Sequence, residues 1–224
     1  MMINIVFITD VHGKYEVIPK IFEEEEPDYV LIGGDLTDFG PLDGVIPALE
    51  EIPAPAFVIP GNCDPKEIIQ IIDASDAISL HKKSIDLGSI TITGLGGSNT
   101  TPFNTLFEMS EEEIAATLAE VLAKTKKNRW NILVTHAPPQ GALDGIGEDG
   151  SVHVGSVSVA AVVREFDIVC CGHIHEQKGI AEFERRICVN PGPASEGNYA
   201  VITLTDEDEP VIELRNVHER SEEE

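Results

Sequence analysis

The chain has 224 residues and a formal net charge of −25, from 40 acidic and 15 basic side chains. This length is enough for one well-buried core, and a hydrophobic content of 42% is that of an ordinary globular protein. The excess of acids argues against extended contact with a nucleic-acid backbone, which requires clusters of Lys and Arg.

No apolar run is long enough to cross a bilayer, so we expect no membrane partner. The first apolar run, residues 1–9, also lacks the basic region and the cleavage site of a signal peptide. The four cysteines show neither C-x-x-C spacing nor a disulfide framework. Reduced thiols in a cytoplasmic protein are therefore the expectation.

Strand and helix patterns alternate through the N-terminal third of the chain. In chain order, we expect strands over 3–9, 29–34 and 56–61, and helices over 15–27, 42–52 and 65–75. Pro47 lies inside the second helical pattern and leaves the ends of that helix open. Short apolar strands that alternate with helices predict a parallel α/β sheet.

The rest of the chain is richer in strands. Residues 110–127 form the clearest helical pattern, because Ser110 and Glu113 have the spacing of a capping box. A second helix is expected across 156–165, and strands are expected over 89–97, 131–135, 167–172, 186–192, 198–204 and 210–217. We predict a single domain over residues 1–216, followed by an acidic tail over 217–224.

Polar side chains follow five of the apolar runs at the point where each run ends. They are Asp10 and His12, Asp35, Asn62, His136, and His173 and His175. Because the carboxyl ends of parallel strands share one edge of a sheet, these side chains are expected to converge. Carboxylate, imidazole and amide donors without thiolate suit borderline divalent metals, and seven donors are more than one ion needs.

The order of these short motifs resembles the calcineurin-like metallophosphoesterase family. The motifs are D-x-H at 10–12, G-D at 34–35, G-N at 61–62, T-H at 135–136 and G-H-x-H at 172–175. Four further stretches, "THAPPQG", "HVGS", "GHIHE" and "NPGP", resemble the Icc-related predicted phosphoesterases of prokaryotes. The resemblance implies an α/β fold in which two mixed β-sheets pack as a four-layer sandwich with flanking helices.

The resemblance also implies a dinuclear metal site and a hydrolytic activity. Asp10, His12, Asp35 and His175 would hold the first ion, and Asp35, Asn62, His136 and His173 the second. Manganese is the first choice, with Fe, Zn, Ni or Co as alternatives. A metal-bridged hydroxide would attack the phosphate ester, with Asp35, Asn62 and His136 taking part in catalysis. We expect a phosphodiesterase acting on a small or nucleotide-like substrate.

Cys63 stands where many family members have a histidine that orients the substrate or protonates the leaving group. Asp38, the usual partner of that histidine, is present. We interpret Cys63 as a small side chain that lines the site, because the surrounding Asp residues oppose formation of a thiolate nucleophile. Without this proton donor, diesters with good leaving groups should react more easily than alkyl monoesters.

Some residues and alternatives stay open at this stage. His153 and Asn190 are candidates for substrate contacts, whereas His81 and His218 are interpreted as surface residues. The alternative functions are a phosphomonoesterase or protein phosphatase, and a non-catalytic interaction scaffold on the same fold. A nuclease acting on polymeric nucleic acid is disfavoured by the net charge of −25. The sequence indicates no oligomeric state.

Overall fold

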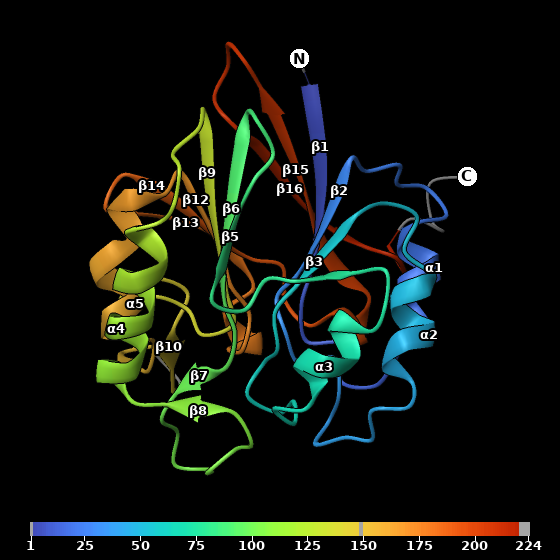
Figure 1. Cartoon of the computed structure of the whole chain (residues 1–224), viewed down its shortest axis with the longest axis horizontal. Coiled ribbons are helices and arrows are strands. Elements are labelled where there is room, and N and C mark those ends of the chain that lie inside the picture. Colours follow the sequence, from blue (N-terminus) through green and yellow to red (C-terminus); the bar gives the residue numbers. More distant parts are fainter. Residues whose placement is uncertain (1, 148–149, 220–224) are drawn as a thin grey trace.

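The computed structural model describes residues 2–147 and 150–219 and contains two six-stranded β-sheets packed face to face (Figure 1). The first sheet has the order β16-β15-β1-β2-β3-β4. Its strands are β1 (Met2–Ile8), β2 (Tyr29–Ile32), β3 (Ala56–Val58), β4 (Ile78–Ser79), β15 (Asn198–Thr205) and β16 (Val211–Asn216).

The second sheet has the order β13-β14-β12-β9-β6-β5. Its strands are β5 (Lys83–Asp86), β6 (Ile90–Leu95), β9 (Trp130–Thr135), β12 (Ile168–Cys170), β13 (Gly179–Phe183) and β14 (Arg186–Asn190). Two small ribbons pair β7 (Ser98–Asn99) with β8 (Glu108–Met109), and β10 (Gly145–Ile146) with β11 (Val152–His153).

Both large sheets are mixed, as the sequence predicts. The strands β1 to β4 run parallel, while β15 pairs antiparallel with both β1 and β16. In the second sheet, β6, β9, β12 and β14 run parallel, while β5 and β13 are antiparallel edges. The carboxyl ends of the parallel strands therefore meet at one end of the molecule.

The central core lies between the sheets, and strand β1 shows how the sequence builds it. Ile5 and Phe7 face the second sheet, where they pack with Ile132 and Ile168. Val6, between them in the sequence, faces the opposite way and packs with the helices. Successive residues of a strand point to opposite faces, so a strand buried on both faces is apolar throughout.

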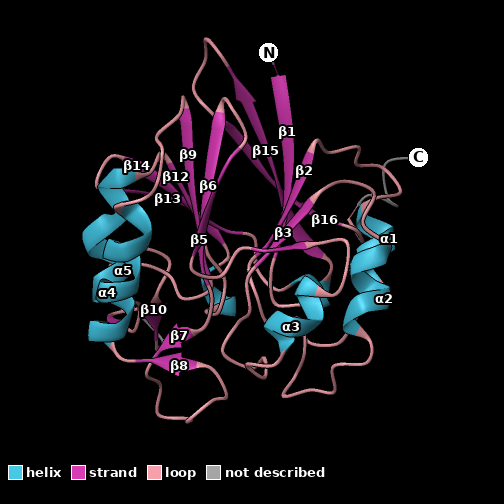
Figure 2. Cartoon of the chain, viewed as in Figure 1, coloured by secondary structure: helices cyan, strands magenta, loops and turns pink. Residues whose placement is uncertain are grey.

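Helices cover the outer face of each sheet (Figure 2). The first sheet is covered by α1 (Val17–Ile21), α2 (Val45–Glu50) and α3 (Ile68–Asp73), and the second by α4 (Glu111–Leu122) and α5 (Val157–Val162). Three short 3₁₀ turns are η1 (Val163–Glu165), η2 (His175–Gln177) and η3 (Ala194–Glu196). The predicted four-layer α/β sandwich is confirmed.

The helices are shorter than the sequence predicts. The expected helix over 15–27 is only α1, which ends before the acidic run 23–26, where adjacent like charges disfavour helix. Helix α4 begins at the predicted capping box, with Ser110 and Glu113 bonded reciprocally. The strands β4 and β5 were not predicted.

In the described part of the chain, no helix has the length and apolar character needed to span a membrane. The domain boundary expected at residue 217 stays a prediction, and residues 220–224 of the expected tail lie outside the described residues.

Candidate metal centre

The predicted donor side chains lie at the carboxyl ends of strands from both sheets. The first sheet contributes Asp10 and His12 after β1, Asp35 after β2 and Asn62 after β3, and the second contributes His136 after β9 and His173 and His175 after β12. The site is therefore built across the seam between the two sheets.

Backbone hydrogen bonds join the loops that carry the first four donors. The Asp10 N–H donates to Gly34 O at 3.0 Å, and the His12 N–H donates to Asp35 O at 2.8 Å. The Cys63 N–H donates to Asp35 Oδ1 at 2.8 Å. These bonds fix the loops after β1, β2 and β3 relative to one another before any ligand is considered.

Several donors sit on strained backbone. Asp10, His12, Asp35 and His173 have φ values of 57°, 48°, 50° and 69°. Residues other than glycine rarely adopt this left-handed region, and such strain concentrates at functional sites.

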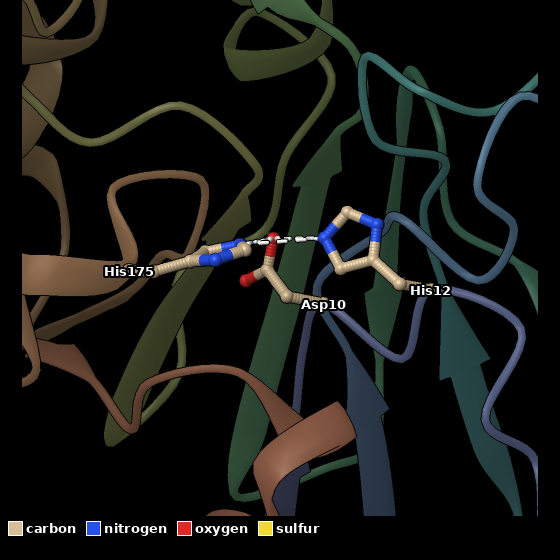
Figure 3. Close-up of side chains that lie close together, drawn as sticks. All are labelled: Asp10, His12 and His175. Carbon is tan, nitrogen blue, oxygen red and sulfur yellow. Dashed lines mark hydrogen bonds and ion pairs between the residues drawn. The ribbon is translucent and has the colours of Figure 1, made fainter.

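Asp10, His12 and His175 form one side of the cluster (Figure 3). Asp10 Oδ1 lies 3.8 Å from His12 Nε2 and 3.3 Å from His175 Nε2. The two imidazole Nε2 atoms are only 3.3 Å apart. The carboxylate is fully buried, and it also accepts a hydrogen bond from Thr9 Oγ1 at 2.9 Å.

Asp35, Asn62 and His136 form the other side. Asp35 Oδ2 lies 3.4 Å from His136 Nε2 and 3.8 Å from His12 Nε2, so one carboxylate oxygen faces both halves of the cluster. His136 Nδ1 donates to Gly33 O at 2.8 Å, which leaves Nε2 as the atom that faces the site. This Nε2 lies 2.8 Å from Asn62 Oδ1.

The charged groups of the cluster shift one another's pKa values, because they lie close together in a buried space. Burial alone would lower the pKa of His136, but the carboxylates of Asp35 and Asp10 outweigh it and raise the pKa to about 9. Burial would raise the pKa of Asp10, but His175 and His136 hold it well below its usual range. Strong mutual shifts of this kind are typical of functional clusters.

His173 completes the cluster from the second sheet. Its ring lies 5.1 Å from the ring of His136, centroid to centroid, and its backbone N–H donates to Asp10 Oδ2 at 3.2 Å. Burial, followed by the charge of His136, lowers the pKa of His173 to about 4. The ring is therefore neutral at physiological pH, which is the state in which imidazole binds metals.

Cys63 is half-buried beside His12 and Asp35. Burial, followed by the charge of Asp35 and its hydrogen bond to the thiol, raises the pKa of Cys63 far above its usual range. Asp38, which is exposed, adds to this effect. The thiolate needed by a nucleophile is absent at neutral pH, in agreement with the interpretation of Cys63 as a lining residue.

The two candidate substrate contacts lie in different surroundings. The Asn190 side chain is fully buried, donating to Ile174 O at 2.9 Å and accepting from the Gly192 N–H at 2.9 Å. It supports the loop that carries His173 and His175. His153 lies on β11 and is hydrogen-bonded to Asp144. Substrate contact by either residue stays a prediction.

The surface interpretation of His81 is wrong. His81 is only 9% exposed, and its Nδ1 accepts a hydrogen bond from the Gly96 N–H at 2.9 Å. The flanking residues Lys82 and Lys83 are exposed, so the local sequence resembles a surface turn. His218 is exposed, as expected.

Asp64 is a structural carboxylate that sequence reasoning did not assign. It is fully buried and accepts hydrogen bonds from the backbone N–H groups of Leu36, Thr37 and Gly61. These three bonds lock the loop after β2 to the loop after β3. The position of Asp64 two residues after Asn62 could have predicted this role, because an acid in a glycine turn commonly accepts hydrogen bonds from backbone N–H groups.

Two glycines let the backbone approach the carboxylates closely. A Cβ at Gly61 would overlap Asp35 Oδ1, and a Cβ at Gly172 would overlap Asp10 Oδ2 and Thr9 Oγ1. The G-N and G-H motifs therefore have a steric reason for their glycines.

The donor set fits divalent metal ions. Three overlapping groups of described residues bring metal-ligating atoms within 4.8 Å of one another, namely Asp10 with His12 and His175, His12 with Asp35 and Cys63, and Asp10 with Asp35 and His136. Facing imidazole nitrogens and buried carboxylates hold several lone pairs in one small volume. A cation is the natural partner for such an arrangement, and oxygen and nitrogen donors suit Mn, Fe, Co, Ni or Zn.

Comparison with known sequences agrees with this donor pattern. Residues 3–177 match the family described as calcineurin-like phosphoesterase. An uncharacterised protein of Methanocaldococcus jannaschii is 39% identical over 200 residues, which is 86% of this chain and 89% of that protein. Because the family match spans most of the chain, it includes every one of the seven donors.

Solved structures share the fold over almost the whole chain. The crystal structure of TT1561 from Thermus thermophilus has a TM-score of 0.73 at 18% identity and covers 97% of this chain and 100% of its own. A dimetal phosphatase from Danio rerio has a TM-score of 0.63 at 13% identity and covers 96% of each chain. At these identities the likeness extends to the fold alone.

Proposed function

The chain belongs to the calcineurin-like phosphoesterase family, and from this premise we propose that it hydrolyses phosphate esters with the help of two divalent metal ions. The substrate we propose is a small or nucleotide-like phosphodiester. The observation that carries the proposal is the position of Asp35 Oδ2 between His12 Nε2 and His136 Nε2, at 3.8 and 3.4 Å. A carboxylate oxygen that faces both halves of the cluster is suited to bridge two cations.

In this proposal, each half of the cluster holds one ion. The first ion is held by Asp10, His12, Asp35 and His175, and the second by Asp35, Asn62, His136 and His173. Manganese remains our first choice. When bound, such ions supply an activated water and positive charge for the phosphoryl oxygens. The dimetal phosphatase from Danio rerio, which shares this fold, is consistent with such a centre.

The protein's own residues would orient the ligands and limit their movement. The hydrogen bond from His136 Nδ1 to Gly33 O keeps Nε2 directed at the site, as hydrogen-bond partners of metal-binding histidines generally do. Asp35 Oδ1 is held by the Cys63 N–H, which leaves Oδ2 for the ions. Asn62 contributes a neutral oxygen, which limits the negative charge around an anionic substrate.

Preference for diesters has two supports. A phosphodiester carries one negative charge, whereas a monoester carries close to two at neutral pH, and a chain of net charge −25 repels the dianion more strongly. In addition, the raised pKa of the Cys63 thiol makes it a weak proton donor for a poor leaving group.

The direct test is a paired assay on metal-stripped protein, with and without added Mn²⁺. Hydrolysis of methyl p-nitrophenyl phosphate and of p-nitrophenyl phosphate would be followed side by side, together with the bound metal. We expect manganese-dependent turnover that favours the diester. Preference for the monoester would retain the metal site and overturn the diester assignment. No turnover of either ester with two ions bound would favour the scaffold alternative.

A further inference from the structure

His153 and Asp144 form an oriented pair outside the donor cluster. His153 Nδ1 lies 2.7 Å from Asp144 Oδ1, and the side chains of these residues are 50% and 1% exposed. The second oxygen, Asp144 Oδ2, accepts from the Gly155 N–H at 2.9 Å. A carboxylate only accepts, so Nδ1 donates to Asp144, and Nε2 is the ring nitrogen that this bond does not use.

The pair lies in the segment between β9 and α5. This segment joins the loop that carries His136 to the part of the chain that leads to His173 and His175. This segment begins directly after His136 and leads through β10 and β11 to α5. Leu143, next to Asp144, lies beside Gly179, where an added Cβ would stand 3.5 Å from Leu143 Cδ2, and Gly179 follows the turn that contains His175.

The same segment is also tied to the loop beside Asn62. Asn99 Nδ2 in β7 donates to Val154 O at 3.0 Å, and the Phe107 N–H, just before β8, donates to Asn62 O at 3.0 Å. Figure 1 shows β10 at the same end of the molecule as β7 and β8. These contacts connect the segment that carries His153, through β7 and β8, to the loop that carries Asn62.

Hydrolysis of an ester with a poor leaving group needs a proton donor, and Cys63 does not meet that need. We propose that His153 is a catalytic residue that protonates the leaving oxygen from Nε2, and that Asp144 is its positioning residue. This inference rests on the proposed phosphodiesterase function. A buried carboxylate that fixes the tautomer and direction of an imidazole is an arrangement that general acid–base catalysis uses.

The step balances in atoms and charge. Water forms the new bond to phosphorus and gives up one proton to solvent, while the bond from phosphorus to the leaving oxygen breaks. That oxygen keeps the electron pair and receives the Nε2 proton of the His153 imidazolium. The imidazole left behind is neutral and keeps its Nδ1 proton, which stays hydrogen-bonded to Asp144. Solvent reprotonates Nε2 before the next turnover.

A proton donor at His153 widens the range of leaving groups that the enzyme can release. If His153 supplies the proton, the absence of histidine at position 63 no longer restricts the enzyme to good leaving groups. The preference for diesters then depends on substrate charge alone.

The test compares His153→Gln with the wild type on two diesters, methyl p-nitrophenyl phosphate and methyl phenyl phosphate. Both proteins are loaded with manganese, and the bound metal is measured. We expect a loss in kcat of about 100-fold or more on the phenyl ester, whose leaving group needs the proton, and only a few-fold loss on the nitrophenyl ester. His218→Gln is the matched control, because His218 is exposed and lies outside this segment.

Asp144→Asn tests the positioning role separately. An amide can offer Nδ1 either its oxygen or its N–H, so the ring is no longer held in one tautomer, and the loss in kcat should again fall mainly on the phenyl ester. The double variant should lose no more activity than His153→Gln alone, because the two residues act as one unit. A role in folding alone would lower the turnover of both esters equally.

Three outcomes would overturn the inference. Equal losses on both esters, or no loss on either, would exclude a proton donor and leave the proposed phosphodiesterase function intact. Loss of manganese from His153→Gln would place the residue among the ligands instead. Failure of the manganese-loaded wild type to hydrolyse either ester would overturn the proposed function, and this inference with it.

Discussion

His136 Nε2 and Asn62 Oδ1 lie 2.8 Å apart and connect the two sheets at the centre of the site. His136 follows β9 of the second sheet, and Asn62 follows β3 of the first. Neither sheet alone contains a complete donor set for either proposed ion. The relative position of the sheets is therefore part of the site, and changes that disturb the packing between them should alter metal binding.

Asp64→Asn should weaken metal binding without removing a ligand. The buried carboxylate holds the N–H groups of Leu36, Thr37 and Gly61, and an amide can replace only part of that acceptor capacity. We expect manganese affinity to fall by about 10- to 100-fold, as for other residues that support ligands. Metal titration would measure this. Asp38→Asn, at an exposed acid on the loop after β2, is the control and should bind as the wild type does.

Gly172→Ala should disrupt the first ion site by steric overlap. The added Cβ would collide with Asp10 Oδ2 and Thr9 Oγ1, so the carboxylate must move. Bound manganese per chain should decrease, as measured by elemental analysis after gel filtration. Gly179→Ala is the control, because its Cβ would meet Leu143 Cδ2 at an ordinary 3.5 Å. Equal metal content in the two variants would contradict the steric argument.

Cys63→Ser should retain most of the turnover. The thiol has a pKa raised by burial and by Asp35, so it is neither a nucleophile nor an effective acid at neutral pH. Steady-state kinetics with the metal content held constant would test this, and iodoacetamide should alkylate Cys63 slowly. A large decrease in kcat with unchanged metal would mean that the thiol has a direct chemical role.

His81 should make the fold sensitive to moderate acid. Burial, followed by Lys82 and Lys66, lowers the pKa of His81 to about 4 in the folded protein, while the unfolded chain keeps a value near 6.5. Between these values the unfolded state binds more protons, so the free energy of unfolding falls as the pH drops from about 6.5 to about 4. The loss attributable to His81 is at most roughly 3 kcal/mol.

The measurement is urea unfolding across this pH range for the wild type and for His81→Asn. The Asn side chain can accept the Gly96 N–H but does not titrate, so the variant should show a smaller decrease in stability. Identical pH dependence in the two proteins would exclude His81 as the cause.

Much of the fold was predictable because its strands carry strong local signals. The apolar runs that become β1, β2, β9 and β12 are short and uninterrupted, as expected of strands buried on both faces. The strands β4 and β5 were missed because residues 78–86 are partly exposed, with His81 and Lys82 between the two strands and Lys83 opening β5. Their pairing depends on neighbouring strands that are distant in sequence, which a local pattern does not contain.

The convergence of the seven donors was predictable for a geometric reason, since parallel strands end at a shared edge. Their role as metal ligands stays a prediction. The residues that support the donors and His153 were harder to predict from the sequence. Asp144 pairs with His153 only because a loop folds back over nine residues, and Asp64 acts on a loop that is 27 residues away. Such partners depend on loop conformation, for which the sequence offers no periodic signal.

The place of β1 in its sheet has a consequence for synthesis on the ribosome. Strand β1 lies between β2 and β15, and the Ser195 N–H donates to Asp10 O at 3.1 Å. Asp10 is translated well before the strand and the turn that hold it. A nascent chain can pair β1 with β2 early, but it cannot finish this sheet until residues 198–205 have left the exit tunnel. Metal capture at Asp10 should therefore wait until this later segment has emerged.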